Sequence, residues 1–431
     1  MENKVLIITY YWPPSGGSGV QRWLKFAKYL PSFGWKPYIF TPANPSFAIR
    51  DESLLRDVPK EAQVIHFPIW EPYEAFFKLS GLLGNKKSAK PTELVSGKKK
   101  SLFQKVSTWV RGNLFIPDPR VFWVKPSVRF LLKYVQEQGI KTIITTGPPH
   151  SVHLIGLKLK RKNPSLKWLA DFRDPWSDWG LLDSLMVGGI ARSMHRRLEA
   201  QVVKMADVVI TITPFYVRKF EKLSGRPVRL LTNGFDEDDF KNLVITRHTK
   251  FIIRHAGIVN EKCDPRPFML AVKSLLQEQP ELREKLQIDF VGEVHPDFRA
   301  FVQQDDDLKS ITTFTPTIPH KQLMALYGES AVMLLVLTGY KDAEGYMPGK
   351  LFEYLATGLP VLGVGPEQGD AAALLNISGA GVMIDGNHTA AIKIFIQQKF
   401  NAWKSTDSIA KAPGSQIYSR RAITQTLTEM L

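Results

Sequence analysis

The sequence of 431 residues contains one cysteine, Cys263. A single thiol excludes an intrachain disulfide and is typical of a protein from a reducing compartment. Long apolar runs are also lacking, because the best one, residues 331–337, falls well short of the roughly 18–20 residues that a membrane-spanning helix needs. The apolar start, residues 5–11, is too short for a secretory signal and runs into Pro13-Pro14. We therefore expect a cytoplasmic protein whose contact with a membrane, if it has any, is peripheral.

Acidic residues are scarce in the first part of the chain. The chain has 57 Lys and Arg against 41 Asp and Glu, a formal charge of +16. Residues 1–250 hold 40 basic and 21 acidic residues, a balance of +19, and residues 251–431 hold 17 and 20, a balance of −3. Such an excess favours nucleic acid, a phospholipid surface or an anionic substrate as partner, although a solvated charged face is the plainer interpretation. No nucleic-acid-binding signature is present, so we expect no nucleic-acid partner.

The apolar pattern predicts an α/β protein with two doubly wound domains. Short apolar runs alternate with helical patterns, which is typical of parallel sheets covered by helices. The predicted strands are residues 5–9, 36–40, 63–66, 142–146, 167–170, 207–213 and 228–231, and then 251–257, 286–291, 311–314, 331–337, 360–364 and 381–384. We expect a first domain at 1–240, a hinge at 236–250 and a second domain at 250–431. The last helix, near 419–431, can pack back on the first domain.

A basic insertion near residues 76–120 departs from this pattern. It carries Lys86, Lys87, Lys90 and the lysines at 98–100. Apolar residues at roughly helical spacing follow, namely Leu102, Phe103, Val106, Trp109 and Val110. One interpretation is a basic amphipathic segment that lies on an anionic membrane. The other is an ordinary loop followed by a packed helix.

Two glycine-containing loops precede predicted helices. The first, with Gly16 and Gly17, follows the first strand, and the free N–H groups at its helix can receive a phosphate or an acidic sugar. Its spacing does not fit a dinucleotide fingerprint, and no acidic residue ends the second strand, so a nicotinamide enzyme is not expected. The second loop opens the helix that contains Gly349, Lys350 and Glu353. One cation, backbone N–H donors and a carboxylate that accepts two hydroxyl hydrogen bonds suit a nucleoside diphosphate.

Here the sequence resembles the family 4 glycosyltransferases of the GT-B fold, particularly bacterial enzymes that build surface polysaccharides. The resemblance covers nearly the whole chain and rests on the Gly-rich loop, on residues 232–236 with Phe240, on the strand ending at Gly257 and above all on residues 348–361. It implies two Rossmann-like domains that face each other across a cleft. The second domain would hold a nucleotide-sugar, which is a substrate and not a cofactor, and the first would hold the acceptor.

The resemblance also implies the donor-binding residues, which are Lys262, Arg266, Gly349, Lys350, Leu351 and Glu353. Glu353 matches the family's second motif glutamate, which binds the donor ribose. The first glutamate would lie at position 345, which is Gly345 here, and Glu344 is one residue out of register. The usual arginine after the first strand of this domain is missing as well, and Lys262 is the nearest match.

On the acceptor side, the loops at 145–153 and 171–176 both follow strands of the first sheet. Similar loops in the family line the cleft, so the resemblance implies that His150, Arg173 and Asp174 are the catalytic residues. The alternatives are a histidine that caps the following helix and an ion pair of Arg173 with Asp171 or Asp174.

Metal binding is not expected, because the Asp-x-Asp element within 236–239 lies in the predicted hinge and ends no strand of a nucleotide pocket, and the three aspartates at 305–307 are interpreted as a solvated turn. The resulting hypothesis is a metal-independent, retaining transferase with a lipid-linked or saccharide acceptor, peripheral on an anionic inner leaflet. The rivals are a sugar-nucleotide epimerase or phosphorylase of the same fold, and a noncatalytic basic membrane-binding protein.

Overall fold

The computed structural model describes residues 3–45, 47, 49–71, 102–178, 180–339, 343–405 and 415–431. Residues 72–101 lie outside the described residues, and with them Lys86, Lys87, Lys90 and the lysines at 98–100 of the predicted basic insertion. The chain divides into two compact units, which are Met1–Thr232 with Thr424–Leu431 (unit 1) and Asn233–Ile423 (unit 2). Among the described residues, no helix combines the length and the apolar character needed to cross a membrane.

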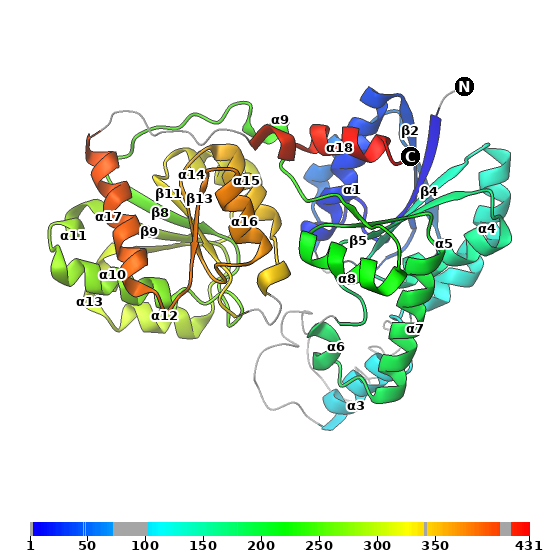
Figure 1. Cartoon of the computed structure of the whole chain (residues 1–431), viewed down its shortest axis with the longest axis horizontal. Helices are drawn as coiled ribbons and strands as arrows, with labels where there is room; N and C mark the ends of the chain where they lie inside the picture. Colours follow the sequence, from blue (N-terminus) through cyan, green and yellow to red (C-terminus); the bar gives the residue numbers. More distant parts are fainter. Residues whose placement is uncertain are drawn as a thin grey trace. The chain divides into compact units, whose positions relative to one another are not determined.

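Unit 1 contains a parallel sheet of seven strands in the order β3-β2-β1-β4-β5-β6-β7. The strands are β1 (Asn3–Ile8), β2 (Trp35–Pro42), β3 (Gln63–Phe67), β4 (Thr142–Gly147), β5 (Lys167–Phe172), β6 (Val208–Thr211) and β7 (Arg229–Leu230). The helices are α1 (Ser18–Tyr29), α3 (Leu102–Asn113), α4 (Val121–Glu137), α5 (Ser151–Lys162), α6 (Gly180–Ser184), α7 (Gly189–Met205) and α8 (Pro214–Ser224). Apolar side chains of α4, α5, α7 and α8 join those of the strands in one core. Figure 1 shows these helices beside the sheet. The central strand β4 is buried along its whole length and β5 is buried from Trp168 onward, as expected of a sheet covered on both faces.

Unit 2 contains a parallel sheet of six strands in the order β10-β9-β8-β11-β12-β13. The strands are β8 (Phe251–Ala256), β9 (Leu286–Val291), β10 (Thr312–Thr315), β11 (Val332–Val336), β12 (Val361–Val364) and β13 (Gly381–Ile384). The helices are α9 (Glu237–Phe240), α10 (Arg266–Glu278), α11 (Leu282–Lys285), α12 (Pro296–Gln303), α13 (Asp306–Ile311), α14 (His320–Gly328), α15 (Gly349–Thr357), α16 (Asp370–Ile377) and α17 (Thr389–Ser405). Two cores lie on its two faces, one with α10, α12, α13 and α17 and the other with α14, α15 and α16 (Figure 1).

The predicted fold class is confirmed, because each predicted strand overlaps a strand of one of the two sheets. In both sheets the strand order reverses beside the first strand, between β1 and β4 in unit 1 and between β8 and β11 in unit 2. Ligands of such sheets bind at the carboxyl ends of the strands at this reversal point. These two edges are therefore where the predicted site residues must be sought.

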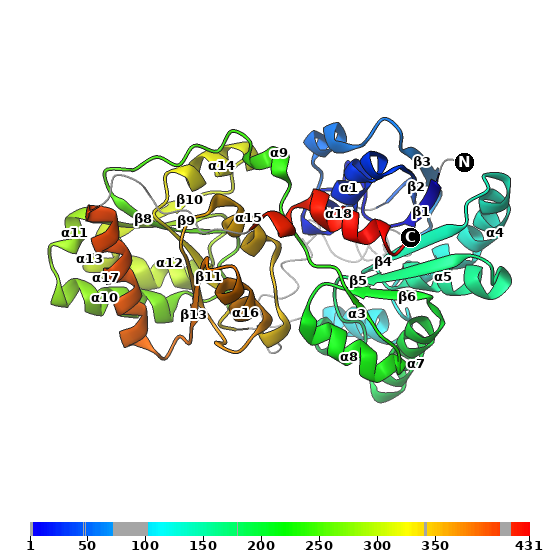
Figure 2. The ribbon, with the colours of Figure 1, turned by 45° about the horizontal axis from the view of Figure 1, so that its top comes forward.

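The last helix, α18 (Arg420–Thr428), begins in unit 2, and its residues from Thr424 onward belong to unit 1. It lies beside α1 in both ribbon views (Figures 1 and 2). The segment before it runs along the chain just past Thr232, since Phe235 and Ser419 are bridged and Gly234 has no room for a Cβ beside the Tyr418 carbonyl. Close packing against Tyr418 therefore requires a glycine at position 234.

The segment predicted as a hinge packs on unit 2. Asp236 caps the short helix α9 by accepting a hydrogen bond from the N–H of Asp238. Further along, Phe240, Leu243 and Ile245 pack against the core that contains α14, α15 and α16. The Asp-x-Asp element therefore forms a helix start, and the described residues contain no group of three or more His, Cys, Asp or Glu side chains that could hold a metal ion.

Candidate functional site

The predicted donor residues gather at the carboxyl end of β8, at the reversal point of the second sheet. Helix α15 begins after Pro348 and carries Lys350 in its first turn. A Cβ built on Gly257, the residue after β8, would lie 2.8 Å from the Lys350 Nζ atom. The glycine, whose φ is +126°, therefore leaves room for the ammonium group directly over the backbone that ends the strand.

The Lys350 ammonium is held by a histidine to which the sequence analysis assigned no role. His255 is fully buried, and its Nε2 lies 3.3 Å from the Lys350 Nζ, while its Nδ1 lies 3.0 Å from the Leu334 carbonyl oxygen. Because a carbonyl only accepts, Nδ1 carries the proton and Nε2 presents a lone pair to the ammonium. Burial, and then the charge of Lys350, hold the pKa of His255 well below its ordinary value, so the ring stays neutral.

Burial also lowers the pKa of Lys350, and the neighbouring Cys263 and Glu353 oppose that shift. A desolvated ammonium interacts more strongly with an incoming anion than a solvated one does. Its position at a helix N-terminus adds the unpaired N–H groups of the first turn. The arrangement therefore suits a diphosphate.

Glu353 lies three residues further along α15, where helical spacing places it on the same side as Lys350. Its Oε2 accepts a hydrogen bond of 3.2 Å from the hydroxyl of the buried Tyr327, and its Oε1 lies 3.7 Å from the His320 Nε2. Burial, and then Glu353, raise the pKa of Tyr327 well above its ordinary value, so this tyrosine donates. The carboxylate is thus oriented but half-exposed, as a receptor for two neighbouring hydroxyls would be.

Other predicted donor residues have different surroundings. Leu351 is fully buried in the core and its N–H donates to the Pro348 carbonyl, so its side chain has no ligand-facing part. Gly349 is exposed, with open space where a Cβ would be. Lys262 is exposed in the loop after β8, whereas Arg266 pairs with Asp264 at 3.0 Å. Arg254, on β8, is buried in an ion pair with Asp289.

That Glu344 replaces the family's first motif glutamate, which would lie at position 345, stays a hypothesis. Gly345 is buried in a short 3-10 turn, Ala343–Gly345, and Glu344 is exposed. The backbone of Glu344 lies beside Gly369, at the start of α16, where a Cβ would come within 3.0 Å of it.

In unit 1, the predicted acceptor residues lie at the carboxyl ends of β4 and β5. Arg173 forms no ion pair with Asp171 or Asp174. Its guanidinium donates to three backbone carbonyls, those of Gly19, Gly147 and Pro148, and so ties the start of α1 to the loop after β4. Asp171 pairs instead with the buried Arg22, at 2.9 Å. The ion-pair alternative of the sequence analysis is therefore wrong, and Arg173 holds two site loops together.

His150 is buried and stacks on Trp176, with ring centroids 4.9 Å apart and planes 3° from parallel. It is the residue before α5 but its side chain does not cap the helix; the Asp118 carboxylate accepts from the N–H and hydroxyl of Ser151 instead. Burial, and then His153, lower the pKa of His150 well below its ordinary value. A neutral imidazole in an aromatic stack is the result.

Asp174, the third predicted catalytic residue, has a half-exposed side chain. Among the described residues its carboxylate has no hydrogen-bond or ion-pair partner at close range. Burial raises its pKa, although Arg173 opposes the shift. An acid with these properties is suited to proton transfer or to contact with a hydroxyl of a substrate.

The Gly-rich loop is engaged within unit 1. The N–H of Gly16 donates to the Ile49 carbonyl at 2.9 Å, and a Cβ at this position would collide with the Ile49 side chain. Gly17, with φ of +88°, is the N-cap residue directly before α1. Gly16 therefore has a packing role and its N–H is not available to a phosphate.

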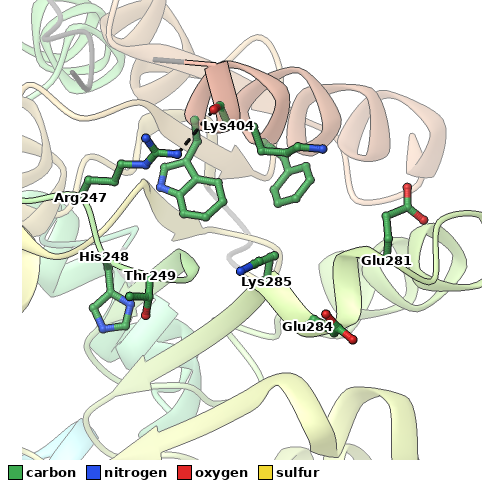
Figure 3. Close-up of a pocket in the computed structure, with 9 residues that line it drawn as sticks. Arg247, His248, Thr249, Glu281, Glu284, Lys285 and Lys404 are labelled. Atoms are coloured by element: carbon green, nitrogen blue, oxygen red, sulfur yellow. Dashed lines mark hydrogen bonds between the residues drawn. The ribbon is translucent and has the colours of Figure 1, made fainter. Parts of the chain in front are cut away.

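Two hollows in the described surface lie away from the Lys350 site. One, of about 580 Å³, is lined by Thr249 and Lys285, which precede β8 and β9, and by residues near the end of α17 (Figure 3). This is the amino end of the second sheet, the edge opposite Gly257. The other, of about 540 Å³, lies beside Ser177 and Glu199 in unit 1.

Comparison with solved structures identifies the fold. Sucrose-phosphate synthase from Thermosynechococcus elongatus superposes with a TM-score of 0.59 and 15% identity, over 99% of this chain and 98% of that one. WaaG, a glycosyltransferase involved in lipopolysaccharide biosynthesis, gives 0.54 and 13%, over 99% of each chain. The chain has the GT-B fold.

The fold is also found in a protein described as a UDP-N-acetylglucosamine 2-epimerase from Listeria monocytogenes, with a TM-score of 0.53, 10% identity and coverage of 99% of this chain and 95% of that one. No family model matches the sequence, and no curated protein matches it. At these identities the comparisons establish the architecture, and the chemistry has to be argued from the side chains.

Proposed function

We propose that this chain is a glycosyltransferase that moves a sugar from a nucleotide-sugar donor to an acceptor, without a metal and with retention of anomeric configuration. The observation that carries the proposal is the partly buried Lys350 ammonium over Gly257, with Glu353 one turn further along the same helix. This pair offers a cation for a diphosphate and a carboxylate for a ribose at the edge where doubly wound sheets bind ligands.

In the proposed reaction, the bond between the sugar and the diphosphate breaks, and negative charge develops on the departing phosphate. Lys350 and the N–H groups that begin α15 offset this charge, and because they are fixed before the reaction they need no reorganisation. The acceptor hydroxyl attacks from the same face, and its proton passes to the departing phosphate. Such a route needs no separate protein base.

On the acceptor side, Asp174 is the group that we assign to contact with the acceptor, because its carboxylate is half-exposed and its pKa is raised. His150 and Arg173 are assigned a positioning role. The guanidinium of Arg173 fixes the loop that leads to His150, and the His150 ring stacks on Trp176, two residues after Asp174.

We further propose that the chain is a family 4 glycosyltransferase that acts in surface-polysaccharide biosynthesis. This assignment is supported by the resemblance of residues 348–361 and by the +19 balance of residues 1–250, which favours a lipid-linked acceptor at an anionic inner leaflet. The donor half, with a balance of −3, then relies on local cations such as Lys350 to bind its anionic ligand.

The test begins with thermal unfolding in the presence of a panel of nucleotide-sugars, because a ligand of the folded state raises stability by RT ln(1 + [L]/Kd). The donor found in this way is then incubated with acceptors and the products are analysed by mass and by the anomeric NMR signal. Lys350→Ala should lower turnover by about 10²–10³-fold, the cost of losing one preorganised charge donor. Lys309→Ala, an exposed lysine on α13 of the same unit, is the matched control and should leave turnover unchanged.

A sugar-nucleotide epimerase is the second candidate, favoured by the Listeria monocytogenes structure. It would convert the nucleotide-sugar alone, with no acceptor present. A new nucleotide-sugar in that control reaction would replace the transferase proposal. Absence of stabilisation by every nucleotide would favour a noncatalytic role instead.

A further inference from the structure

An exposed face of unit 1 combines large apolar side chains with basic ones. Its apolar members come from α3 and from α7 with the turn before it. They are Val106 and Trp109 on α3, exposed by 53% and 48%, and Met186, Ile190 and Met194, exposed by 43%, 83% and 48%. We call this the α3–α7 face.

The two elements form one continuous surface. The Asn113 side chain, at the end of α3, donates to the Met186 carbonyl at 3.1 Å and accepts from the Gly188 N–H at 2.8 Å. A Cβ on Gly112 would collide with the Leu185 carbonyl, so the last turn of α3 lies directly against the turn that leads into α7. The end of α3 and the start of α7 therefore meet.

The exposed residues of α7 form a stripe. Ile190, Met194 and Arg197 follow one another at spacings of four and three residues, which places them on one side of the helix. The opposite side is buried and includes His195, Glu199 and Val202. An apolar stripe that points away from the core is left for a partner to cover.

The charge of the face is mainly basic, although the exposed Asp183, just before the turn, pairs with Arg192 at 2.7 Å. The sequences of α3 and α7 contain Lys105, Arg111, Arg192, Arg196, Arg197 and Lys204. Their single acidic residue, Glu199, is buried and accepts hydrogen bonds from the backbone of Trp176 and Ser177, so it faces inward. The solvent side of both helices thus presents basic and apolar groups together.

We propose that the α3–α7 face docks on the surface of an anionic phospholipid membrane, with Ile190, Met194 and Trp109 inserted at the level of the headgroups. Charge complementarity selects this occupant. A second copy of the chain, related by a two-fold axis, would bring two basic faces together. Nucleic acid would make no use of exposed isoleucine and methionine side chains. Apolar insertion and attraction to anionic headgroups reinforce each other.

The membrane proposal rests on the proposed function in one respect: binding would bring the enzyme to a membrane-bound acceptor. Binding to the membrane does not itself require catalysis. The experiment measures sedimentation of the whole chain with vesicles of phosphatidylcholine alone and of phosphatidylcholine mixed with phosphatidylglycerol. We expect binding to the anionic vesicles that weakens as salt is raised. The double substitution Ile190→Glu and Met194→Glu should weaken it by about tenfold or more.

The matched control is Ile377→Glu with Ile394→Glu, because these isoleucines of unit 2 are also exposed, by 80% and 55%. A second readout uses the fact that Cys263, the single cysteine, is buried. An environment-sensitive fluorophore attached through Ile190→Cys should shift to the blue on anionic vesicles, and the same label at Ile377→Cys should not.

Equal binding to neutral and anionic vesicles, no binding to either, or equal loss in the control pair would overturn the proposal. A concentration-dependent dimer that Ile190→Glu disrupts, without an effect on vesicles, would assign the face to a second copy. Nucleotide stabilisation is measured on the same samples. If the vesicles bind and no nucleotide does, the transferase proposal fails and the membrane proposal stands.

Discussion

The Lys350 Nζ lies 3.3 Å from the Nε2 atom of His255, although 95 residues separate them in the chain. The other ring nitrogen of His255 is fixed by the Leu334 carbonyl, so the imidazole acts as a neutral acceptor that holds the ammonium over Gly257. A flexible lysine is thereby given one position at the end of β8.

Replacement of His255 tests this relationship. His255→Phe keeps an aromatic ring in the core but removes the acceptor, so Lys350 loses its fixed position. We expect kcat to fall by about tenfold, which is near the value of one charge-assisted hydrogen bond, with little change in the KM for the donor. Steady-state kinetics measure this split. A rise in KM alone would show that His255 contributes to donor binding and does not position the cation.

The lowered pKa of Lys350 predicts an alkaline limit to activity. Burial disfavours the ammonium, so it loses its proton below the ordinary lysine pKa of 10.5 as pH rises. A plot of log(kcat/KM) against pH should therefore turn down on the alkaline side with a limiting slope of −1, and the turn should come at a pH lower than 10.5. Lys350→Arg keeps a cation at every accessible pH, and its profile should lose this limb even if its activity is low. An identical limb in both proteins would assign it to another group.

Tyr327 and Glu353 should act together in nucleotide binding. Glu353→Gln removes the charged acceptor and should weaken nucleoside diphosphate binding by about tenfold, as expected for hydrogen bonds to a carboxylate. Tyr327→Phe removes the hydroxyl that orients Glu353 and should cost about threefold to tenfold. Calorimetric titration measures both, and the double variant should lose less than the two changes combined. Glu344→Gln in the same series shows whether that residue also holds the donor.

Substitutions of Arg173 and of Asp174 should have different effects on the free energy of unfolding. Arg173→Lys cannot satisfy the three carbonyls that the guanidinium now serves, so the free energy of unfolding should fall by about 2–3 kcal/mol. Asp174→Asn should leave stability at pH 7 unchanged or raise it. The folded state raises the pKa of this carboxyl and so disfavours its charge, and the gain should vanish at low pH, where the carboxyl is protonated.

If Asp174 contacts the acceptor, Asp174→Asn should lower transfer by about tenfold or more despite its stability. Urea unfolding and turnover are measured on the same preparations. Retained stability with lost turnover in Arg173→Lys would give Arg173 a direct role in the reaction.

The buried histidines of unit 1 should make the fold sensitive to acid. Burial lowers the pKa of His153 to about 3 and that of His195 to about 4. The unfolded chain protonates near pH 6.5, so from about pH 6.5 down to about pH 4 it binds more protons than the folded chain, and the free energy of unfolding falls as pH falls. Each histidine adds a slope of at most about 1.4 kcal/mol per pH unit.

His195→Gln provides the control for this prediction. Glutamine keeps an acceptor for the Trp176 Nε1, which now donates to His195 at 3.0 Å. In the variant, the slope of the unfolding free energy against pH should decrease by the contribution of one titrating histidine. An unchanged slope would mean that His195 titrates alike in the folded and unfolded chains.

Much of the fold was predictable because each strand is a short apolar run and each helix has its own periodicity. The helix that contains Lys350 and Glu353 was also predictable, since a spacing of three residues fixes their common side before any tertiary contact forms. The partners of buried polar groups were not. Arg22, rather than Arg173, pairs with Asp171 across 149 residues of sequence.

The sequence by itself determined the alternation of strands and helices, the separation of charge between the two parts of the chain and the placement of Lys350 and Glu353 on one side of a helix. Only the tertiary structure decided that His255 holds Lys350, that Arg173 serves backbone carbonyls, and that α3 and α7 share one exposed face. The reason is physical: periodicity is a property of neighbours in the chain, whereas the partner of a side chain depends on which strands and loops the sheet order brings together.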